Sequence, residues 1–301
     1  MSLAPLVIIN PAAGGGRVVR SIAWLRERLA MRAEARLEVT NRPGDAEALA
    51  AGAARQGHDR VIAIGGDGTV QEVVNGLLTA ARPASIGVVP VGSGNDLARS
   101  LGLPAELAGA WRVAIGATTR PIDVARAHNG AGIERWFASA GGVGFDAQVA
   151  TAMARRSGWQ AGRAGYLLTT LSELRRFENC HVRLTLDGET STREVLFVAI
   201  ANGAYYGGGM RIAPGARPDD GHLDVCVVGD ISRLTALREL PNLYRGTHLR
   251  NPAVSMATAR EIEIDGDART RVHLDGEPFG TLPLRVSLAP RALEMAAPGS
   301  S

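Results

Sequence analysis

Apolar runs that end in glycine-rich loops recur along the first part of this 301-residue chain. These runs occupy residues 6–9, 61–64 and 85–89, and the loops after them contain Gly14, Gly65 and Gly92. A further run lies at residues 36–40, and helical spacing follows the first loop at residues 18–31. Repeated strand, loop and helix units predict a doubly wound parallel sheet with helices on both faces. Ligands of such sheets collect beyond the carboxyl ends of the strands, where all three glycine loops fall.

Strand-like alternation predominates after about residue 121. Two helical stretches interrupt it, at residues 145–176, with breaks at Gly158 and Gly162, and at residues 231–244. The strand-like runs are residues 122–127, 182–186, 194–201, 222–228, 261–264, 271–274 and 283–288. We therefore predict an α/β domain at residues 1–121 and a mainly antiparallel, β-sandwich-like domain at residues 122–284. The tail, from about residue 285 to residue 301, is free to return to the first domain.

The composition argues against several classes of protein. Aromatic residues make up only 4% of the chain, which leaves little material for stacking nucleic-acid bases. All 33 basic residues are arginine, so lysine Schiff-base chemistry and the lysine of a Walker A loop are excluded. Cys180 and Cys226 lie far apart without metal-ligand spacing. Because no apolar run approaches the roughly 20 residues of a membrane span, we expect a soluble, cytoplasmic protein.

The segment IGGDGTVQEVVNG, residues 64–76, has the features of a phosphate-binding turn. Its glycines allow a sharp turn and expose main-chain N–H groups to an anion. Asp67 stands among them, and a carboxylate facing phosphate requires a cation between the two. We therefore predict that Asp67 acts through Mg²⁺ or its water shell, so that Asp67→Ala damages turnover more than folding. In the structural interpretation, Thr69 is the N-cap of the next helix and Glu72 completes a capping box.

Several motifs together resemble one family. GGDGTVQEVVNGL at residues 65–77 and VPVGSGNDLARSLGLP at residues 89–104 resemble the diacylglycerol kinase catalytic-domain family, which includes sphingosine and ceramide kinases. The resemblance continues, in chain order, at residues 9–17, 141–149, 202–225 and 273–278. It spans nearly the whole chain and is strongest to the soluble bacterial lipid kinases.

The resemblance implies two domains with ATP in the cleft between them. The first domain would be similar to those of phosphofructokinase and NAD kinase, and the β-rich domain would close over it. Asp96 would join Asp67 in a hydrogen-bonded network near the phosphates. The positions that match the family's nucleotide site are Asn10, Pro11, Gly14, Gly15, Thr40, Gly65, Gly66, Asp67, Gly68, Thr69, Gly92, Ser93 and Asn95.

The resemblance also gives roles to two acidic turns of the second domain. In RPDDG it implies a structural Mg²⁺ held by the Asp220 carboxylate and the backbone carbonyls of Arg217 and His222; a solvated turn is the structural alternative. LDGEP reads as a hairpin turn, yet the family places its proton acceptor there. Alternation along an extended segment would put Asp275 and Glu277 on the same face, so both remain candidates, with Glu277 preferred.

The resulting hypothesis is an ATP- and Mg²⁺-dependent lipid kinase acting on a hydroxyl of a diacylglycerol-like lipid. Such an acceptor implies transient, peripheral contact with a membrane, and no contact with nucleic acid is expected. The oligomeric state, including a homo-oligomer, is open. The alternatives are a sphingoid lipid, phosphatidylglycerol or NAD as acceptor, or a nucleotide-binding module without catalysis.

Overall fold

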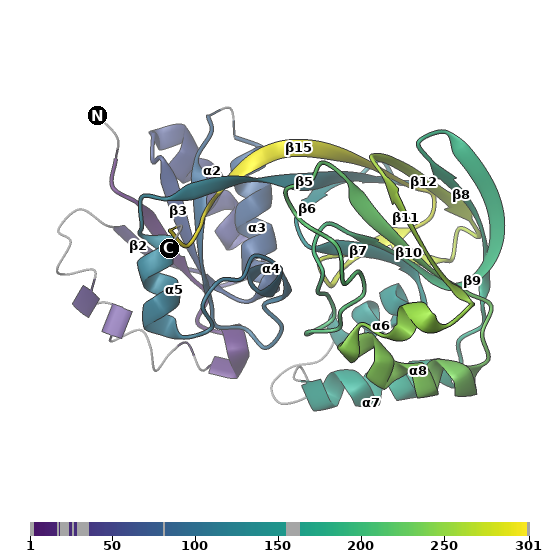
Figure 1. The fold of residues 1–301 in the computed structure, drawn as a ribbon. Helices are drawn as coiled ribbons and strands as arrows, with labels where there is room; N and C mark the ends of the chain where they lie inside the picture. The colour runs from purple at the N-terminus through teal and green to yellow at the C-terminus, as the bar shows by residue number, and fades with distance from the viewer. Residues whose placement is uncertain are drawn as a thin grey trace. The chain divides into compact units, whose positions relative to one another are not determined.

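The computed structural model describes residues 3–16, 18, 24–25, 27–28, 36–80, 82–154 and 163–299. The chain forms two compact units, Met1–Ile122 with Arg291–Ser301, and Asp123–Pro290. It passes from one unit to the other within two long strands, β5 (Thr119–Asn129) and β15 (Leu284–Ala296) (Figure 1). Most of the helix predicted at residues 18–31, Arg17 of the first matched motif, and the breaks at Gly158 and Gly162 lie outside the described residues.

The first unit is built on a parallel sheet. Its strands lie in the order β2 (Arg36–Val39), β1 (Leu6–Ile9), β3 (Arg60–Gly65) and β4 (Ser85–Pro90). The end of β15 joins this sheet beside β4, in parallel, through Met295 opposite Ile86. The central strands are apolar and buried on both faces, as parallel strands covered by helices must be.

Helices cover both faces of this sheet, which confirms the doubly wound architecture (Figure 1). The helix α5 (Leu107–Ala114) packs on one face, where Trp111 and Ala114 meet Val7 and Ile9 of β1. The helices α2 (Asp45–Gln56) and α3 (Asp67–Leu78) cover the other face. A short helix, α4 (Asp96–Ser100), follows β4.

The second unit is a mainly antiparallel, sandwich-like β structure. Its strands follow the order β14, β13, β7, β9, β8, β12 and β15, while β10 and β11 continue from β9, and β5 and β6 from β15. The remaining strands are β6 (Glu134–Phe137), β7 (Ala140–Gly144), β8 (Cys180–Leu186), β9 (Glu189–Ala201), β10 (Leu223–Gly229), β11 (Val254–Ala259), β12 (Glu261–Gly266), β13 (Arg271–Leu274) and β14 (Glu277–Thr281).

Strand β9 separates two hydrophobic cores in this unit. Val198 and Ile200 face the inner core between the strands. Phe197 and Ala199 alternate with them and face an outer core. Three helices cover that outer face: α6 (Phe145–Ala154), α7 (Arg163–Leu174) and α8 (Arg233–Arg245). A short 3₁₀ helix, η3 (His248–Arg250), follows α8.

Four strands, β6, β7, β11 and β14, were not predicted from the sequence. In β7 the reason is composition, because its sequence AGGVG is rich in glycine, which is depleted in strands. Among the helices that the structure describes, none is long and apolar enough to cross a lipid bilayer.

Candidate functional site

The predicted nucleotide-binding residues of the first unit lie at the carboxyl ends of its four parallel strands. Thr40 follows β2 and is buried, with its N–H donating to the Ile9 carbonyl at 2.9 Å. The loop after β1 forms a 3₁₀ turn, η1 (Ala13–Gly16), preceded by Asn10 and Pro11. The remaining predicted residues lie at the last position of β3 or follow β3 or β4; they are Gly65, Gly66, Asp67, Gly68, Thr69, Gly92, Ser93, Asn95 and Asp96.

The turns after β3 and β4 touch each other through their main chains. A Cβ atom added to Gly92 would lie only 2.5 Å from the Cα of Gly66. Asn95 shapes the second turn, since its Oδ1 accepts from the Gly92 N–H at 2.9 Å and its Nδ2 donates to the Gly92 carbonyl at 3.0 Å. Asn95 itself adopts a left-handed conformation, with φ of 58°, which asparagine tolerates. Side chains at either glycine would force the two turns apart.

The Asp67 carboxylate joins the same two turns. One of its oxygens accepts from the N–H of Asn95 and the other from the N–H of Asp96, both at 2.7 Å. Asp67 therefore caps the start of α4 from the first turn of α3. Burial raises the pKa of the Asp67 carboxyl group, and the N–H bonds from Asp96 and Asn95 oppose that rise. The predicted link between Asp67 and Asp96 exists, but it runs through the Asp96 main chain.

The predicted N-cap at Thr69 is wrong. Helix α3 begins at Asp67, and its N-cap residue, Gly66, offers no side-chain hydrogen bond. Thr69 lies inside the helix, buried, where its Oγ1 accepts from Asn10 Nδ2 at 3.0 Å. Glu72 does not complete a capping box either, because its Oε2 accepts from the N–H of Ala46 in α2 at 3.1 Å.

This edge of the sheet suits the phosphates of a nucleotide. Helix α3 starts without a side-chain bond at its N-cap, and the positive end of the helix favours an anion there. The η1 glycines have left-handed backbones, with φ of 61° at Gly14 and 68° at Gly15. A Cβ atom at Gly15 would meet nothing within 4 Å, and Ser93 is exposed. There is therefore space for a ligand beside Gly15 and Ser93.

In the second unit, Asp275 is engaged with the main chain of another strand. Its carboxylate accepts from three N–H groups, those of Ala138 at 3.0 Å and of Ser139 and Ala140 at 2.9 Å each. The Asp275 N–H in turn donates to the Ala140 carbonyl at 2.7 Å. These bonds fasten the turn between β13 and β14 to the start of β7.

Glu277 is placed differently from Asp275, so the expectation that the two side chains share a face is wrong. Asp275 has a φ of 49° and Gly276 one of 86°, which makes this segment a tight turn rather than an extended strand. Glu277 is exposed at the first position of β14, which is an edge strand of the sheet. Asp275 therefore organises the turn from which Glu277 projects.

Two buried residues beneath this turn were not predicted from the sequence. His273 Nε2 lies 3.2 Å from Asp146 Oδ2, and both side chains are only 4% exposed. The Gly276 N–H donates to His273 Nδ1 at 3.3 Å, so the His273 ring supports the turn from below. A Cβ atom at Gly142 would lie 1.9 Å from Asp146 Oδ2, which explains the glycine in β7. Both residues lie in matched motifs, but no spacing in the sequence connects them.

The predicted Mg²⁺ turn is anchored by a buried carboxylate. Asp123 is fully buried, and its Oδ2 accepts from the Gly221 N–H at 2.7 Å. Asp220 is exposed, and one of its oxygens accepts from the His222 N–H at 3.1 Å. The Arg217 side chain pairs with Asp219 at 3.2 Å. The predicted ligand is the backbone carbonyl of Arg217, which this ion pair does not involve.

Hard oxygen donors from one turn fit Mg²⁺, and two further observations bear on such a site. Burial, and then repulsion by the charge of Asp220, raise the pKa of Asp224 to about 6. A bound cation would relieve that repulsion. The described residues contain no cluster of three or more His, Cys, Asp or Glu side chains suited to a metal ion. The assignment of Arg217, Asp220 and His222 as ligands stays a prediction.

Two family models match successive parts of the chain. The model of the diacylglycerol kinase catalytic domain matches residues 4–127. The model of the YegS C-terminal NAD kinase beta sandwich-like domain matches residues 139–297.

Individual relatives match over most of their length. A diacylglycerol kinase of Mycobacterium tuberculosis is 33% identical over 294 residues, covering 97% of this chain and 94% of the relative. A probable lipid kinase, YegS-like, of Chromohalobacter salexigens is 34% identical over 269 residues, covering 88% and 84%. The crystal structure of a diacylglycerol kinase from Bacillus anthracis has a TM-score of 0.75 at 25% identity, covering 98% of this chain and 97% of that one.

Asp67→Asn should lower stability, because an amide NH₂ cannot accept the main-chain N–H that one carboxylate oxygen now accepts. We expect a loss of about 1–3 kcal/mol in the free energy of unfolding, measured by urea denaturation. The control is Asp59→Asn, at an exposed aspartate that pairs with Arg82 on the surface. Equal stability of the two variants would contradict the proposed link. Asp67→Ala is thus expected to damage folding as well as turnover.

Asp275→Asn should loosen the start of β7. We expect faster hydrogen–deuterium exchange at the amides of residues 138–140, and most of all at Ala138, because its N–H alone bonds the second carboxylate oxygen and an amide NH₂ cannot accept it. The matched control is Asp267→Asn, at an exposed turn of the same unit. Unchanged exchange at Ala138, Ser139 and Ala140 in Asp275→Asn would show that the carboxylate does not hold the start of the strand.

Proposed function

Because this chain belongs to the diacylglycerol kinase catalytic-domain family and is a lipid kinase, we propose that it transfers the γ-phosphoryl group of ATP to a hydroxyl of a diacylglycerol-like lipid. Bound ATP supplies the phosphoryl group, and Mg²⁺ offsets the negative charge on its phosphates. The chain contributes three things to this reaction: donors for the phosphates, a carboxylate for the acceptor hydroxyl, and an apolar environment for the lipid.

The first unit holds the phosphates in this proposal. Main-chain N–H groups at the start of α3 donate to the phosphate oxygens, and the glycines of η1 let a phosphate approach the main chain after β1. Asp67 keeps its bonds to the N–H groups of Asn95 and Asp96, so it would act on Mg²⁺ through the metal's water shell. Its main task is to hold the two glycine turns at the distance that the phosphates need.

Glu277 accepts the proton of the attacking hydroxyl. The observation that carries this assignment is the contrast within one motif: Asp275 accepts three main-chain N–H groups at residues 138–140, where β7 begins, whereas Glu277 is exposed at the first position of β14. A general base needs access to the proton that it removes. The His273–Asp146 pair supports the turn and so orients Glu277 from behind.

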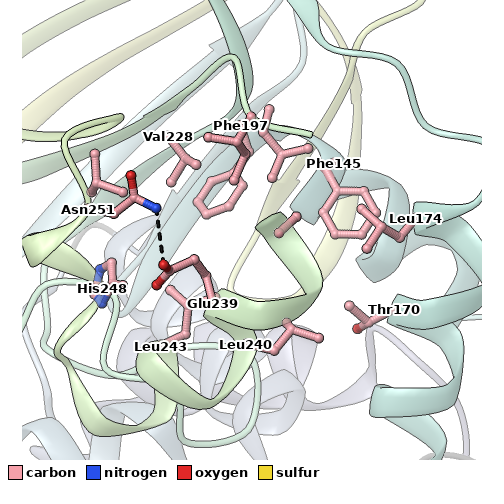
Figure 2. A pocket seen from close by; sticks show the side chains of 14 residues that line it. Phe145, Thr170, Leu174, Phe197, Val228, Glu239, Leu240, Leu243, His248 and Asn251 are labelled. Carbon is pink, nitrogen blue, oxygen red and sulfur yellow. Dashed lines mark hydrogen bonds between the residues drawn. The ribbon is translucent and has the colours of Figure 1, made fainter. Parts of the chain in front are cut away.

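A pocket in the second unit supports an acceptor with acyl chains. It lies between α7, α8 and the outer face of β9 and β10, with about 460 Å³ of empty space, counting the part that is open to solvent. Figure 2 shows its predominantly apolar lining, with Glu239 and Asn251 as a hydrogen-bonded polar pair on one side. Its labelled lining residues are Phe145, Thr170, Leu174, Phe197, Val228, Glu239, Leu240, Leu243, His248 and Asn251. Apolar pockets of this kind bind the apolar part of a ligand.

The assay that tests the function measures transfer of ³²P from ATP. Diacylglycerol, phosphatidylglycerol and a sphingoid base are offered separately in mixed micelles, and NAD in solution. We expect Mg²⁺-dependent labelling of diacylglycerol. Labelling of another acceptor alone would correct the substrate, and labelling of none, with ATP still bound, would contradict the proposal.

Glu277→Gln should lower turnover by about two to four orders of magnitude, because the amide cannot accept a proton. Since Glu277 is exposed, the thermal stability of the Glu277→Gln variant should equal that of the wild type. Glu189→Gln, an exposed change at the start of β9, is the control. If Glu277→Gln keeps wild-type turnover, another group is the base.

A further inference from the structure

Helix α8 is apolar on two opposite sides. Its inner side contributes Ala236 and Leu243 to the outer core. Its outer side exposes Leu234, Leu237 and Tyr244, at 55%, 41% and 38%. Together with exposed Pro241, these residues recur at intervals of three and four, which places them along one face of the helix. We call these four residues the α8 stripe. Single exposed leucines are common, but a continuous stripe marks a contact surface.

Arginines border the α8 stripe on both sides. Arg238 and Arg245, seven residues apart, lie on one side, and Arg233 lies on the other. Arg233 is held in place, since it donates to the carbonyls of Arg175 and Phe177 at the end of α7. Exposed Arg250 of η3 adds a further positive charge.

No acidic side chain on the outer side of α8 offsets these arginines. Glu239 is the one acidic residue of the helix, and it lies on the inner side. Its oxygens accept from Asn251 Nδ2 at 3.1 Å and from Asn242 Nδ2 at 2.9 Å (Figure 2). His248 is buried, and burial lowers its pKa, which keeps the ring neutral at pH 7. The exposed charge of this surface is therefore positive.

Helix α7 also exposes apolar side chains. Leu167 and Leu168 of α7 are 46% and 54% exposed. Their helix and α8 both cover the outer face of β9 and β10, and both line the pocket of Figure 2 through Leu174 and Leu240. The apolar pocket and the exposed leucines thus belong to the same pair of helices.

This combination favours a lipid bilayer over a second copy of the chain. In a two-fold symmetric dimer the same patch faces itself, so Arg238 and Arg245 would meet other arginines. An anionic bilayer instead offers phosphates to the arginines and an apolar layer to the leucines. An apolar stripe with basic residues along its edges is typical of helices that lie in a membrane interface.

We propose that the α8 stripe and its flanking arginines, together with Leu167 and Leu168, dock the second unit onto an anionic membrane surface. The inference rests on the lipid-kinase activity for its choice of partner. In the docked state the leucines enter the boundary between headgroups and acyl chains, and Arg238 and Arg245 pair with lipid phosphates. A lipid that leaves the bilayer at this surface meets the pocket between α7 and α8.

The test is sedimentation of the full-length protein with phosphatidylcholine vesicles, with or without phosphatidylglycerol, in the absence of ATP. The wild type should bind the anionic vesicles far more strongly than the neutral ones. Leu234→Ser with Leu237→Ser should weaken that binding by about tenfold or more. Arg238→Gln with Arg245→Gln should weaken it by about thirtyfold on anionic vesicles and leave the weak neutral binding unchanged.

Matched controls separate this surface from general hydrophobicity and charge. Ile133→Ser removes an apolar side chain that is 56% exposed elsewhere on the second unit. Arg55→Gln with Arg112→Gln removes two exposed helix arginines of the first unit. Both controls should bind like the wild type, and all variants should keep its melting temperature.

Two further readouts make the outcome decisive. With a water-soluble, short-chain diacylglycerol the stripe variants should keep wild-type turnover, so a loss of kinase activity is distinguishable from a loss of docking. The inference is overturned if the wild type does not bind anionic vesicles, or if the stripe variants bind as the wild type does. It is also overturned if the leucine variant converts a dimer into a monomer in sedimentation velocity, because the stripe would then be a contact between copies.

Discussion

The candidate site of the first unit depends on the two hydrogen bonds that the Asp67 carboxylate accepts. The carboxylate joins the first turn of α3 to the start of α4 by accepting from the N–H groups of Asn95 and Asp96. The bond is possible only because Gly66 and Gly92 let the two turns touch. A buried carboxylate with two short N–H partners is well stabilised, and removing it would leave those donors without acceptors. The spacing of the turns, and hence of their other N–H groups, follows from this one side chain.

Asp275 has the corresponding role in the second unit. It accepts three N–H groups at the start of β7 and so fixes the turn that carries Glu277. Asp123 does the same for the turn that carries Asp220. In each case the more buried aspartate binds the main chain next to a more exposed carboxylate, to which the proposed function assigns the contact with substrate or metal. The motifs therefore contain both the chemical group and the group that positions it.

Part of this arrangement could be predicted from the sequence. The apolar runs before the glycine loops predicted the parallel sheet correctly, because buried strands and positive-φ turns leave a direct compositional signal. The start of α3 was predicted wrongly, since Thr69 looked like a cap but the helix starts at Asp67 behind a glycine. The strand β7 was missed because it is rich in glycine, and Gly142 is required by the nearby Asp146 side chain and not by strand propensity. Asp275 and its partners are about 135 positions apart, and no local pattern reports such a contact.

The most direct test of this account is an amide NMR titration of the protein with ATP and Mg²⁺. We expect the largest shifts at the amides of Gly15, Gly68 and Ser93. The amides of Asn95 and Asp96 should remain protected from solvent exchange throughout, because they stay bonded to Asp67. The account would be contradicted if those two amides exchanged freely in the nucleotide-bound protein, or if the shifts fell away from the carboxyl ends of β1, β3 and β4.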